Sequence, residues 1–372
     1  MIHRALAAAA AALLLTASAP PSEAPIDAAR VTSVLEAARV GAGGMAGTVL
    51  IARHGKILYE RAFGPVDPAG GPPHRLGAVW RWASVTKQVT ATIAMQEVAA
   101  GRLDLDAPIR TYLPASRAPF ADRITTRMLM QHVSGVPDTN DSPKGPDGWM
   151  RSYTVAPGSP ETGVPWCEGP TDRAPPAAFR YGDCDFILTA AVLEAITGKP
   201  YATLVRERIA TPLRLSSVGV FPRTRPTVVG YEAGKRESAK FRIGNFGAAG
   251  AIYGTTHDLL AFDHALMGGR LIPAAQRAEM WRGDPKLGYA ALGQWSFASP
   301  LKGCPGGPVK IVERRGAIGG VVLRNVILPE QDMVLIMTAN RDEADAAFGE
   351  IWQQKGITHD VLAAALCPKV AA

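Results

Sequence analysis

Apolar positions near the start of the chain predict a helix followed by a β-hairpin. Between residues 26 and 40 they recur every three or four positions, which is the spacing of a helix with one apolar face. The glycine-rich segment 41–44 then ends this helix, because glycine adopts the backbone conformations found just after a helix. Residues 47–53 and 56–63 favour two strands, and the two residues between them favour a tight turn.

The middle of the chain has a helical character, and strand-like patterns return near its C-terminal end. A helix is predicted over residues 84–100, with Gly101 as its stop signal. The loop 138–176 is rich in proline, glycine and polar residues, and a loop of this length is usually functional or mobile. Further strands are predicted over residues 287–297, 309–314, 320–328 and 333–339, and a closing helix is predicted over residues 344–354.

These elements predict an α+β fold. Two N-terminal strands and several C-terminal strands, with helices between them, imply one antiparallel sheet built from both chain ends and flanked by helices. A mostly helical subdomain, about residues 104–266, is inserted between the two parts of this sheet. We therefore expect a single catalytic domain over residues 26–360.

The first residues have the pattern of a secretory signal peptide. Residues 1–4 carry positive charge, residues 5–15 are apolar, and Ala-Ser-Ala at 17–19 offers a cleavage site of small residues. Pro20 is unfavourable directly after such a site, so the end of the signal peptide at residue 19 is approximate. The apolar run is too short to span a bilayer, and no other run of membrane length follows. The protein is therefore expected to be exported, to a periplasm or to the exterior.

The composition is that of a globular protein with a substantial core. The 372 residues are 47% hydrophobic and 20% charged, and 40 basic against 33 acidic residues give a net charge of +7. The charges are scattered and are not interleaved with aromatic residues. They favour a solvated surface that suits work near an anionic cell envelope, and they argue against a nucleic-acid interface.

Four cysteines are consistent with disulfide bonds in an exported protein. They form no C-x-x-C pair and have no histidine at metal-ligand spacing, which makes a zinc site improbable. Three pairings are possible. A bond between Cys167 and Cys184 would close a proline-rich loop and is preferred, leaving Cys304 with Cys367; the alternative is that all four are reduced and buried.

Ser84 and Lys87 form the pair with the clearest chemical meaning. A spacing of three places both side chains on one helical face, about one turn apart. A neutral lysine amine can take the proton of the serine hydroxyl and so activate it as a nucleophile. The N-terminal end of the helix adds free N–H groups that can hold a developing oxyanion. The alternative is a serine that caps the helix, followed by an ordinary surface lysine.

Four further segments carry short motifs in a fixed order along the chain. They are Leu-Met-Gln-His-Val-Ser-Gly at 129–135, Gly-Lys-Pro-Tyr at 198–201 with Pro-Leu at 212–213, Ala-Gly-Ala-Ile-Tyr-Gly-Thr-Thr-His-Asp-Leu at 249–259, and Asn-Arg-Asp at 340–342. Together with Ser-Val-Thr-Lys at 84–87, this series resembles the serine β-lactamase-like family, which includes class C β-lactamases, D-alanyl-D-alanine carboxypeptidases and related esterases. The resemblance runs from about residue 46 to residue 342 and implies the β-lactamase/transpeptidase-like form of the α+β fold.

The second motif of such enzymes is Y-x-N, and Tyr181-Gly182-Asp183 stands in the matching context, just before a helix predicted over residues 186–196. The resemblance implies that Tyr181 shares the serine proton and passes it to the leaving group. The alternative is a tyrosine at the edge of the core. Asp183 departs from the asparagine of the family. An ionised carboxylate only accepts hydrogen bonds, and it favours the charged form of Lys87.

The third motif of the family is K-T-G or H-x-G, and Arg314-Arg315-Gly316-Ala317 is its best match. Gly316 would let a substrate approach the strand backbone closely. The resemblance implies that the N–H groups of Ala317 and Ser84 form the oxyanion hole. Arg314 departs from the family, because a guanidinium binds a carboxylate in a fork but donates no proton near neutral pH.

The two departures from the family pattern have opposite charges. We predict that Asp183 and Arg314 face each other across the cleft as an ion pair, in which Arg314 partly offsets the pull of Asp183 on Lys87. Asp183, Arg314 and Gly316 are therefore the expected substrate-binding residues.

The expected function is that of an exported serine hydrolase that forms an acyl-enzyme on Ser84. The resemblance implies no metal or organic cofactor, and a small-molecule or peptide substrate such as a D-amino-acid peptide derived from peptidoglycan, an ester or a β-lactam. The two departures argue against an efficient β-lactamase and favour an esterase or a peptidase. The alternative is an impaired relative that binds cell-wall-type ligands without turnover.

One histidine and four tryptophans are expected to support the site or to line the cleft without taking part in the reaction. His132 is expected to fix a loop by a hydrogen bond. Trp80 and Trp82 are expected to pack beneath the nucleophile. Among the tryptophans, Trp149 and Trp166 in the long loop are the better candidates to line the cleft.

Overall fold

The computed structural model describes residues 25–146, 148–222, 228–305 and 307–367. The predicted signal peptide, residues 1–19, lies outside the described residues. Within the described ranges, no helix is both long enough and apolar enough to cross a bilayer.

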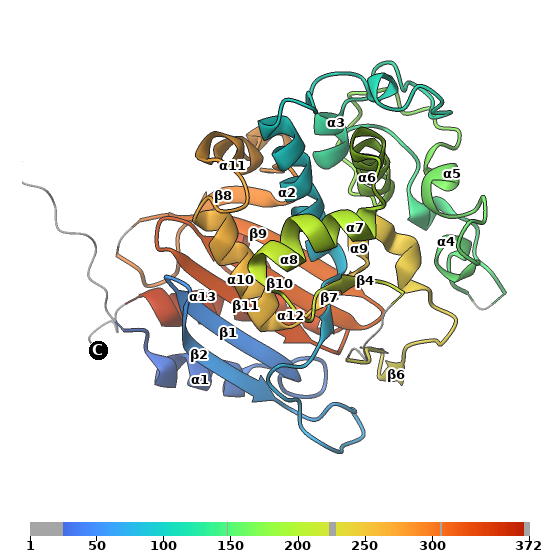
Figure 1. Cartoon of the computed structure of the whole chain (residues 1–372). Helices are drawn as coiled ribbons and strands as arrows, with labels where there is room; N and C mark the ends of the chain where they lie inside the picture. The colour runs from blue at the N-terminus through green and yellow to red at the C-terminus, as the bar shows by residue number, and fades with distance from the viewer. Residues whose placement is uncertain (1–24, 147, 223–227, 306, 368–372) are drawn as a thin grey trace, which may run out of the picture.

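A six-stranded antiparallel sheet forms the centre of the fold (Figure 1). The strand order is β2-β1-β11-β10-β9-β8, so the N-terminal hairpin lies beside the last strand of the chain. The strands are β1 (Gly47–Arg53), β2 (Lys56–Phe63), β8 (Trp295–Ser299), β9 (Val309–Ile318), β10 (Val321–Leu328) and β11 (Met333–Ala339). This arrangement confirms the predicted α+β fold with one sheet built from both chain ends.

Most predicted strands match the structure, but the one predicted over residues 287–297 is largely wrong. The hairpin and β11 have the predicted bounds, and β9 continues four residues further than predicted. In the incorrect segment, Gly288 and Gly293 adopt positive φ angles of 59° and 81°, which a strand does not contain. The extended backbone therefore begins only at Trp295.

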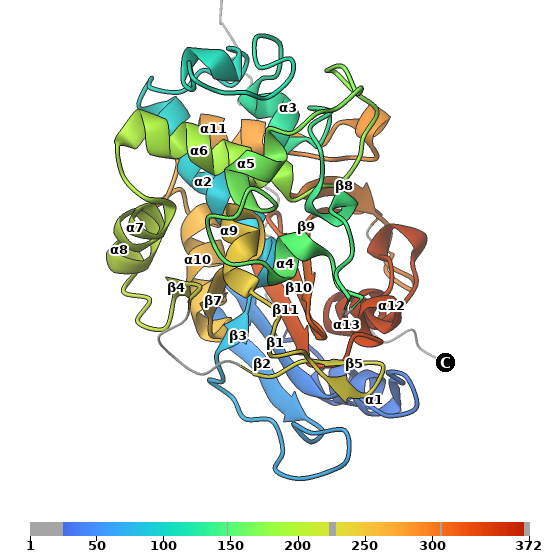
Figure 2. The same ribbon diagram turned by 90° about the vertical axis from the view of Figure 1, so that its right-hand side faces the viewer.

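The sheet separates two hydrophobic cores (Figure 2). Along β11, Val334 and Ile336 belong to one core, whereas Leu335 and Met337 belong to the other, because successive side chains of a strand point to opposite faces. Helices α2 (Thr86–Ala99) and α10 (Thr256–Met267) contribute to the first core. Helices α1 (Ala28–Ala37) and α13 (Ile357–Leu366) fill the second.

The helical insert packs on the outer side of α2, where the longest of its helices is α6 (Cys184–Thr197) (Figure 1). Its other helices are short: α3 (Thr126–Met130), α4 (Arg151–Thr154), α5 (Gly163–Cys167), α7 (Tyr201–Val205), α8 (Thr211–Leu213) and α9 (Gly247–Gly250). A small sheet of β3 (Trp80–Arg81), β7 (Ile252–Gly254) and β4 (Gly219–Val220) joins this part to the turn before α2. The remaining elements are the two-stranded β5 (Tyr231–Glu232) and β6 (Lys235–Arg236), and α11 (Ala274–Met280).

The closing helix predicted over residues 344–354 is interrupted. Helix α12 (Ala344–Phe348) stops at Gly349, whose φ is +70°, and a 3-10 turn follows over Ile351–Gln353. The chain ends with α13, which was not predicted and which packs against α1.

Both preferred disulfide bonds are confirmed. Cys167 is bonded to Cys184, which joins α5 to the start of α6. Cys304 is bonded to Cys367, which ties the end of α13 to the loop before β9.

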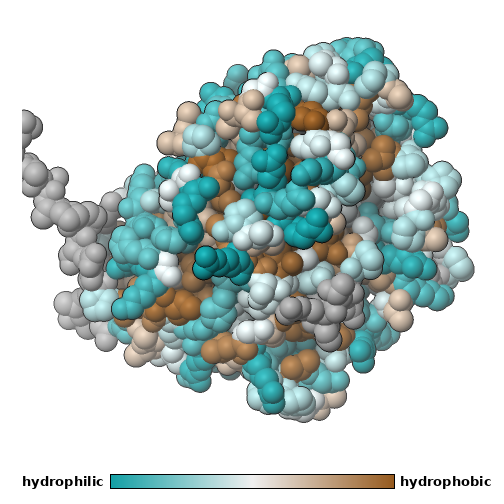
Figure 3. All heavy atoms as spheres, viewed as in Figure 1, coloured by the Kyte–Doolittle hydropathy of each residue, from teal (hydrophilic) through white to brown (hydrophobic). Residues whose placement is uncertain are grey.

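On the face of Figure 3, hydrophobic residues are visible in patches between hydrophilic ones. Within the described residues, the large hydrophobic side chains that are exposed are Leu76, Phe179, Tyr181, Tyr289 and Trp352. Isolated exposed hydrophobic residues need no explanation, but several around one cavity suggest a binding surface.

Candidate active site

The predicted nucleophile Ser84 lies in a tight turn at the start of α2. The turn is a 3-10 helix over Ala83–Val85, and Ala83 has a φ of +47°, which is uncommon for a residue with a side chain. Trp80 and Trp82, which precede the turn, are both buried as predicted. Regular α-helix begins at Thr86, two residues later than the prediction.

Strand β9 passes directly against this turn at Gly316. A Cβ atom at this position would lie 2.5 Å from the carbonyl oxygen of Trp82 and 3.2 Å from the amide nitrogen of Ser84. Only glycine permits this approach. The approach brings the strand and the turn to one cleft. The cleft is lined by Ser84, Tyr181, Trp295, Arg314, Arg315, Ala317 and Asp345.

The hydroxyl of Ser84 lies within hydrogen-bond distance of two predicted partners. The phenol of Tyr181 donates to Ser84 Oγ over 2.7 Å, and Lys87 Nζ donates to the same atom over 3.1 Å. The two partners come from different elements, since Lys87 is in α2 and Tyr181 precedes α6. The structure therefore brings together the serine, lysine and tyrosine that the motifs indicated.

The ammonium group of Lys87 has three acceptors around it. Besides Ser84 Oγ, it donates to Asp183 Oδ1 over 2.6 Å and to the carbonyl oxygen of Ala249 over 3.0 Å. The Lys87 side chain is fully buried. Three acceptors match the three donors of a charged ammonium, so the resting site favours Lys87 in its charged form.

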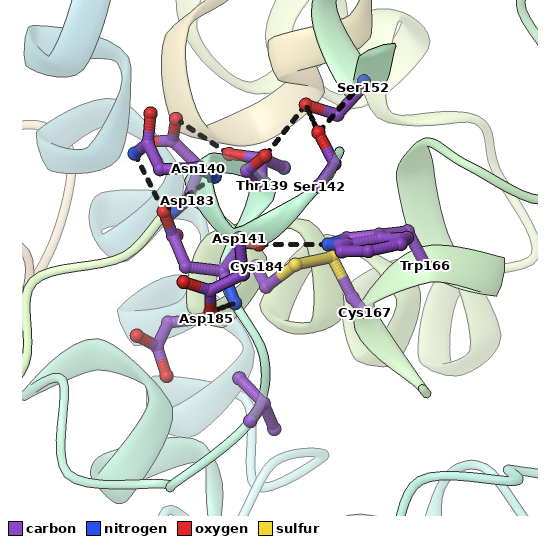
Figure 4. The surroundings of a disulfide bond; sticks show 12 residues. Thr139, Asn140, Asp141, Ser142, Ser152, Trp166, Cys167, Asp183, Cys184 and Asp185 are labelled. Atoms are coloured by element: carbon purple, nitrogen blue, oxygen red, sulfur yellow. Dashed lines mark hydrogen bonds between the residues drawn. A yellow bond between two sulfur atoms is a disulfide. The ribbon is translucent and has the colours of Figure 1, made fainter. Parts of the chain in front are cut away.

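Asp183 is held in place from the side opposite Lys87. Its backbone N–H donates to Asp138 Oδ2 over 2.6 Å, and burial together with the charge of Asp183 raises the pKa of Asp138. The next residue, Cys184, is bonded to Cys167 (Figure 4). A disulfide bond and a buried carboxyl group thus fix the backbone that presents Asp183 to Lys87.

The predicted ion pair between Asp183 and Arg314 is wrong. Both residues are described, and no ion pair joins them. Instead, Asp183 pairs with Lys87, while Arg314 donates to the phenol oxygen of Tyr181 and, over 2.8 Å, to the backbone carbonyl of Ser84. Lys87 is the cation that contacts the Asp183 carboxylate, because Lys87 lies on the face of α2 that points at the start of α6.

Arg314 lies close to two aromatic rings that are stacked on each other. The carbon atom of its guanidinium lies 5.0 Å from the centre of the Tyr181 ring and 5.1 Å from that of the Trp295 ring. Burial lowers the pKa of Arg314, but a guanidinium still carries its charge at neutral pH. The Lys87 ammonium lies 4.8 Å from the same Tyr181 ring. Two cations therefore face the phenol next to Ser84.

The edge of β9 is open beside the cleft. Strand β8 pairs with residues Val309 to Glu313 of β9, and the pairing ends where Trp295 lies opposite Glu313. From Arg314 onwards, the described part of β9 continues along the cleft without β8 beside it. Ala317 is exposed on this segment, close to Ser84.

His132 fixes the segment that carries Tyr181. Its carbonyl oxygen accepts from the N–H of Arg180, and its ring lies 4.7 Å from the Tyr181 ring. The His132 Nδ1 atom accepts from the N–H of Gly182 over 3.3 Å and lies 2.9 Å from Asp185 Oδ2. If Nδ1 is an acceptor, the contact with Asp185 requires a proton on the carboxyl group. Burial indeed raises the pKa of Asp185 to about 8 and lowers the pKa of His132 well below its usual range.

We predict that Asp185→Asn folds normally, because asparagine keeps a neutral side chain of the same shape. Wild type should lose stability relative to this variant as the pH rises from 5 to 8. The folded state holds the Asp185 proton up to a pH of about 8, whereas the unfolded chain releases it near 3.8. The stability that this difference provides is complete below pH 3.8 and is lost as the pH rises to about 8, by at most about 1.4 kcal/mol per pH unit.

Urea denaturation of both proteins at several pH values measures this difference. His132 does not obscure the comparison, because burial holds its pKa well below its usual range and keeps the folded-state ring neutral over this pH interval. A difference in unfolding free energy that stays constant from pH 5 to pH 8 would contradict a protonated Asp185.

The tryptophan that lines the cleft was missed by the sequence prediction. Trp166 donates through Nε1 to the carbonyl oxygen of Asp138, and Trp149 packs against Phe241, so neither lines the cleft. Trp295 does so from the first position of β8. No local motif marks Trp295, and the strand predicted over residues 287–297 gave no indication that Trp295 would face the cleft.

The other motif segments have structural roles. Tyr201 bonds through its hydroxyl to Thr90 on α2 over 2.7 Å, and Ala249 supplies the carbonyl that accepts from Lys87. At the end of β11, Asn340 and Arg341 both donate to the carbonyl oxygen of Val66, which holds the loop after β2.

A comparison with protein families matches residues 32–358 to the family described as Beta-lactamase. The chain belongs to the β-lactamase family. The match covers the sheet, the helical insert and the motif segments, so the resemblance inferred from the short motifs extends to nearly the whole described chain.

Curated members of the β-lactamase family that are similar to this chain have varied activities. Esterase EstB from Burkholderia gladioli is 32% identical over 234 residues, which are 58% of this chain and 58% of the esterase. The D-alanyl-D-alanine-carboxypeptidase/endopeptidase AmpH of Escherichia coli (strain K12) is 24% identical over 320 residues, 80% of each chain. The match therefore spans less than three fifths of the esterase's own length.

Solved structures of the β-lactamase fold are also similar. A D-stereospecific amidohydrolase from Streptomyces sp. matches with a TM-score of 0.69 and 26% identity, covering 92% of this chain and 99% of that one. The D-amino acid amidase from Ochrobactrum anthropi SV3 matches with a TM-score of 0.72 and 22% identity, covering 90% and 97%. These likenesses confirm the predicted fold.

Proposed function

We propose that this protein is a serine hydrolase that works through an acyl-enzyme on Ser84. The observation that carries the proposal is the contact of Ser84 Oγ with both Tyr181 and Lys87, at 2.7 Å and 3.1 Å. A hydroxyl between two groups that can exchange protons is the arrangement needed to activate a serine. The adjoining open edge of β9 leaves room for a substrate carbonyl.

In the proposed reaction, the Tyr181 phenol first gives up its own proton to solvent. The phenolate then takes the proton of Ser84 while Ser84 Oγ attacks the substrate carbonyl. Lys87 already donates to three acceptors as an ammonium, so it supports the reaction by its charge. Lys87 and Arg314 both face the phenol ring, and their charges stabilise the phenolate that exists before it takes the proton. Tyr181 then passes the proton to the leaving group, and water releases the acyl group.

The proposed oxyanion hole uses two backbone N–H groups. Ser84 stands at the start of α2, where N–H groups are free of helical partners, and Ala317 lies on the exposed end of β9. The absence of a side chain at Gly316 brings these two backbones together. Donors placed in this way stabilise the tetrahedral intermediate more than the bound ester or amide.

Esters and D-amino-acid amides or peptides are the proposed substrates. The similar proteins are an esterase, a carboxypeptidase and amidohydrolases, and one scaffold can host all these reactions. We also propose that the protein is exported, since its two disulfide bonds persist in oxidising compartments and are rare in a reducing cytosol. The second candidate function is binding without turnover, which the charged Lys87–Asp183 pair favours.

Covalent labelling tests the proposal. We expect intact-protein mass spectrometry to record one adduct after incubation with a fluorophosphonate, and peptide mapping to locate it on Ser84. The same incubation with a penicillin and with an activated ester distinguishes a peptidase-like site from an esterase-like site. A stable penicillin adduct indicates a peptidase-like site with slow deacylation, whereas ester turnover without a penicillin adduct indicates an esterase-like site.

The binding alternative predicts a different result. A folded protein, verified by circular dichroism, that forms no adduct with any probe and hydrolyses no ester would overturn the hydrolase and support a ligand-binding role.

A further inference from the structure

A second cavity, of about 540 Å³, adjoins the cleft that contains Ser84. Its walls include Tyr289, Trp295, Phe297, Arg315 and Trp352. Trp295 and Arg315 line both this cavity and the cleft, so the two spaces share a wall. In Figure 2, β8 and the segment after α12 lie on the same side of the molecule, and the cavity is formed by residues of both. We call it the aromatic pocket.

The rim of this pocket is formed by aromatic side chains that face solvent. Trp352 is 59% exposed and Tyr289 is 46% exposed, which is unusual for such large side chains. Tyr289 is held rigidly, because its N–H donates to the carbonyl of Asp284 and its own carbonyl accepts from the N–H of Ser296. Phe297 is buried at the inner side. The pocket therefore presents flat apolar surfaces that nothing in the described chain covers.

The charged groups of the pocket are already paired. Arg315 binds the carboxylate of Glu350 through two nitrogens and that of Glu313 through Nε. The indole N–H of Trp352 donates to Glu350 over 2.9 Å. Charges that are satisfied in this way have little to gain from a charged guest. The pocket is suited to an uncharged, flat apolar group, which stacks on aromatic rings.

The position of Trp295 indicates which part of a substrate reaches the pocket. Its ring is stacked on that of Tyr181, with the ring centres 6.2 Å apart and the planes at 24°. In the proposed reaction Tyr181 donates the proton to the leaving group, so the leaving group lies on the Tyr181 side of Ser84. A substituent on that group extends past Trp295 into the pocket.

We propose that the aromatic pocket is the subsite for an aryl or other bulky apolar substituent on the leaving alcohol or amine. This assignment deepens the proposed function and rests on it, because it uses Tyr181 as the proton donor to the leaving group. It names a substrate class, namely acyl donors with a large apolar leaving group and a small acyl group.

The test compares two ester series on wild type and on Trp352→Ala. The first series is ethyl, benzyl and 2-naphthylmethyl acetate, whose alcohols have similar acidity but increasing size. The second is methyl acetate and methyl phenylacetate, in which the acyl group grows. We expect kcat/KM to rise at least about tenfold from ethyl to 2-naphthylmethyl acetate, and Trp352→Ala to remove most of that rise while leaving ethyl acetate unchanged.

Leu76→Ala is the matched control, since Leu76 is another exposed large hydrophobic side chain and lines neither cavity. A preference confined to the acyl series, or an equal loss on all leaving groups in Trp352→Ala, would overturn the proposal. If Ser84 is labelled and esters are hydrolysed without this preference, the subsite fails while the hydrolase stands.

A binding measurement decides the matter even if no ester is turned over. Calorimetric titration with 2-naphthylmethanol should give a dissociation constant at least about fivefold weaker for Trp352→Ala than for wild type and Leu76→Ala. Equal binding to all three proteins would contradict the aromatic pocket as the subsite.

Discussion

Ser84→Ala is expected to lower kcat/KM for an activated ester by roughly 10⁴-fold or more, because it removes the atom that forms the acyl-enzyme. Ser84 is part of a short turn, and its side chain makes hydrogen bonds only to Tyr181 and Lys87 among the described contacts. Alanine fits this turn as well as serine, so folding should be preserved. Steady-state ester hydrolysis, with the fluorophosphonate adduct as a second readout, measures the effect.

Ser33→Ala provides the matched control for this prediction. Ser33 lies on the exposed face of α1, and its hydroxyl bonds only locally, to the carbonyl oxygen of Ala29. It should retain wild-type turnover and labelling. If Ser84→Ala keeps more than about a tenth of the wild-type rate in a preparation free of other hydrolases, the acyl-enzyme mechanism is wrong.

Tyr181→Phe should have the second largest effect, a fall in kcat of about 10³-fold with little change in KM. The variant keeps the ring that contacts Arg314, His132 and Trp295. It removes the hydroxyl, which donates to Ser84 and accepts from Arg314. Since 38% of the residue is exposed, the loss of one hydroxyl should not disturb the fold. Single-turnover acylation by an activated ester separates the chemical step from binding.

Tyr112→Phe removes a hydroxyl of the same kind at a remote place, where it accepts from the N–H of Asp104. It should leave kcat unchanged. If Tyr181→Phe instead raises KM and spares kcat, Tyr181 contributes to substrate binding, and Lys87 becomes the better candidate for the proton acceptor.

Much of the fold could be predicted because its central strands are short apolar runs bounded by turns, buried at nearly every position. β1 and β11 pair with each other from Gly47 to Arg53, so an apolar run of this length corresponds directly to paired backbone. The segment before β8 misled the prediction because it is buried without being extended: Ala290, Ala291 and Leu292 are all buried in turns that pack on neighbouring helices. Burial of irregular backbone produces apolar runs that resemble a strand.

Less of the site could be predicted, because the partners of a charge depend on distance in space. The spacing of Ser84 and Lys87 follows from helix geometry and needs no tertiary information. The choice of Asp183 between Lys87 and Arg314 has no such local rule. Sequence alone indicates that opposite charges occur, whereas the fold determines that Lys87 is the nearer cation. Trp295 escaped notice for the same reason, since only the end of β8 brings it to Tyr181.

The close approach at Gly316 has a consequence for how this protein can be altered. Any side chain there would collide with the backbone of the nucleophile turn, so that position tolerates no variation without moving β9 away from Ser84. The side chains of Tyr289 and Trp352 stand in solvent and can be exchanged without disturbing either core. In the proposed function, reactivity and selectivity would therefore depend on separate positions, one rigidly constrained and the other open. Random mutagenesis around the pocket rim is then expected to change selectivity while it preserves the fold.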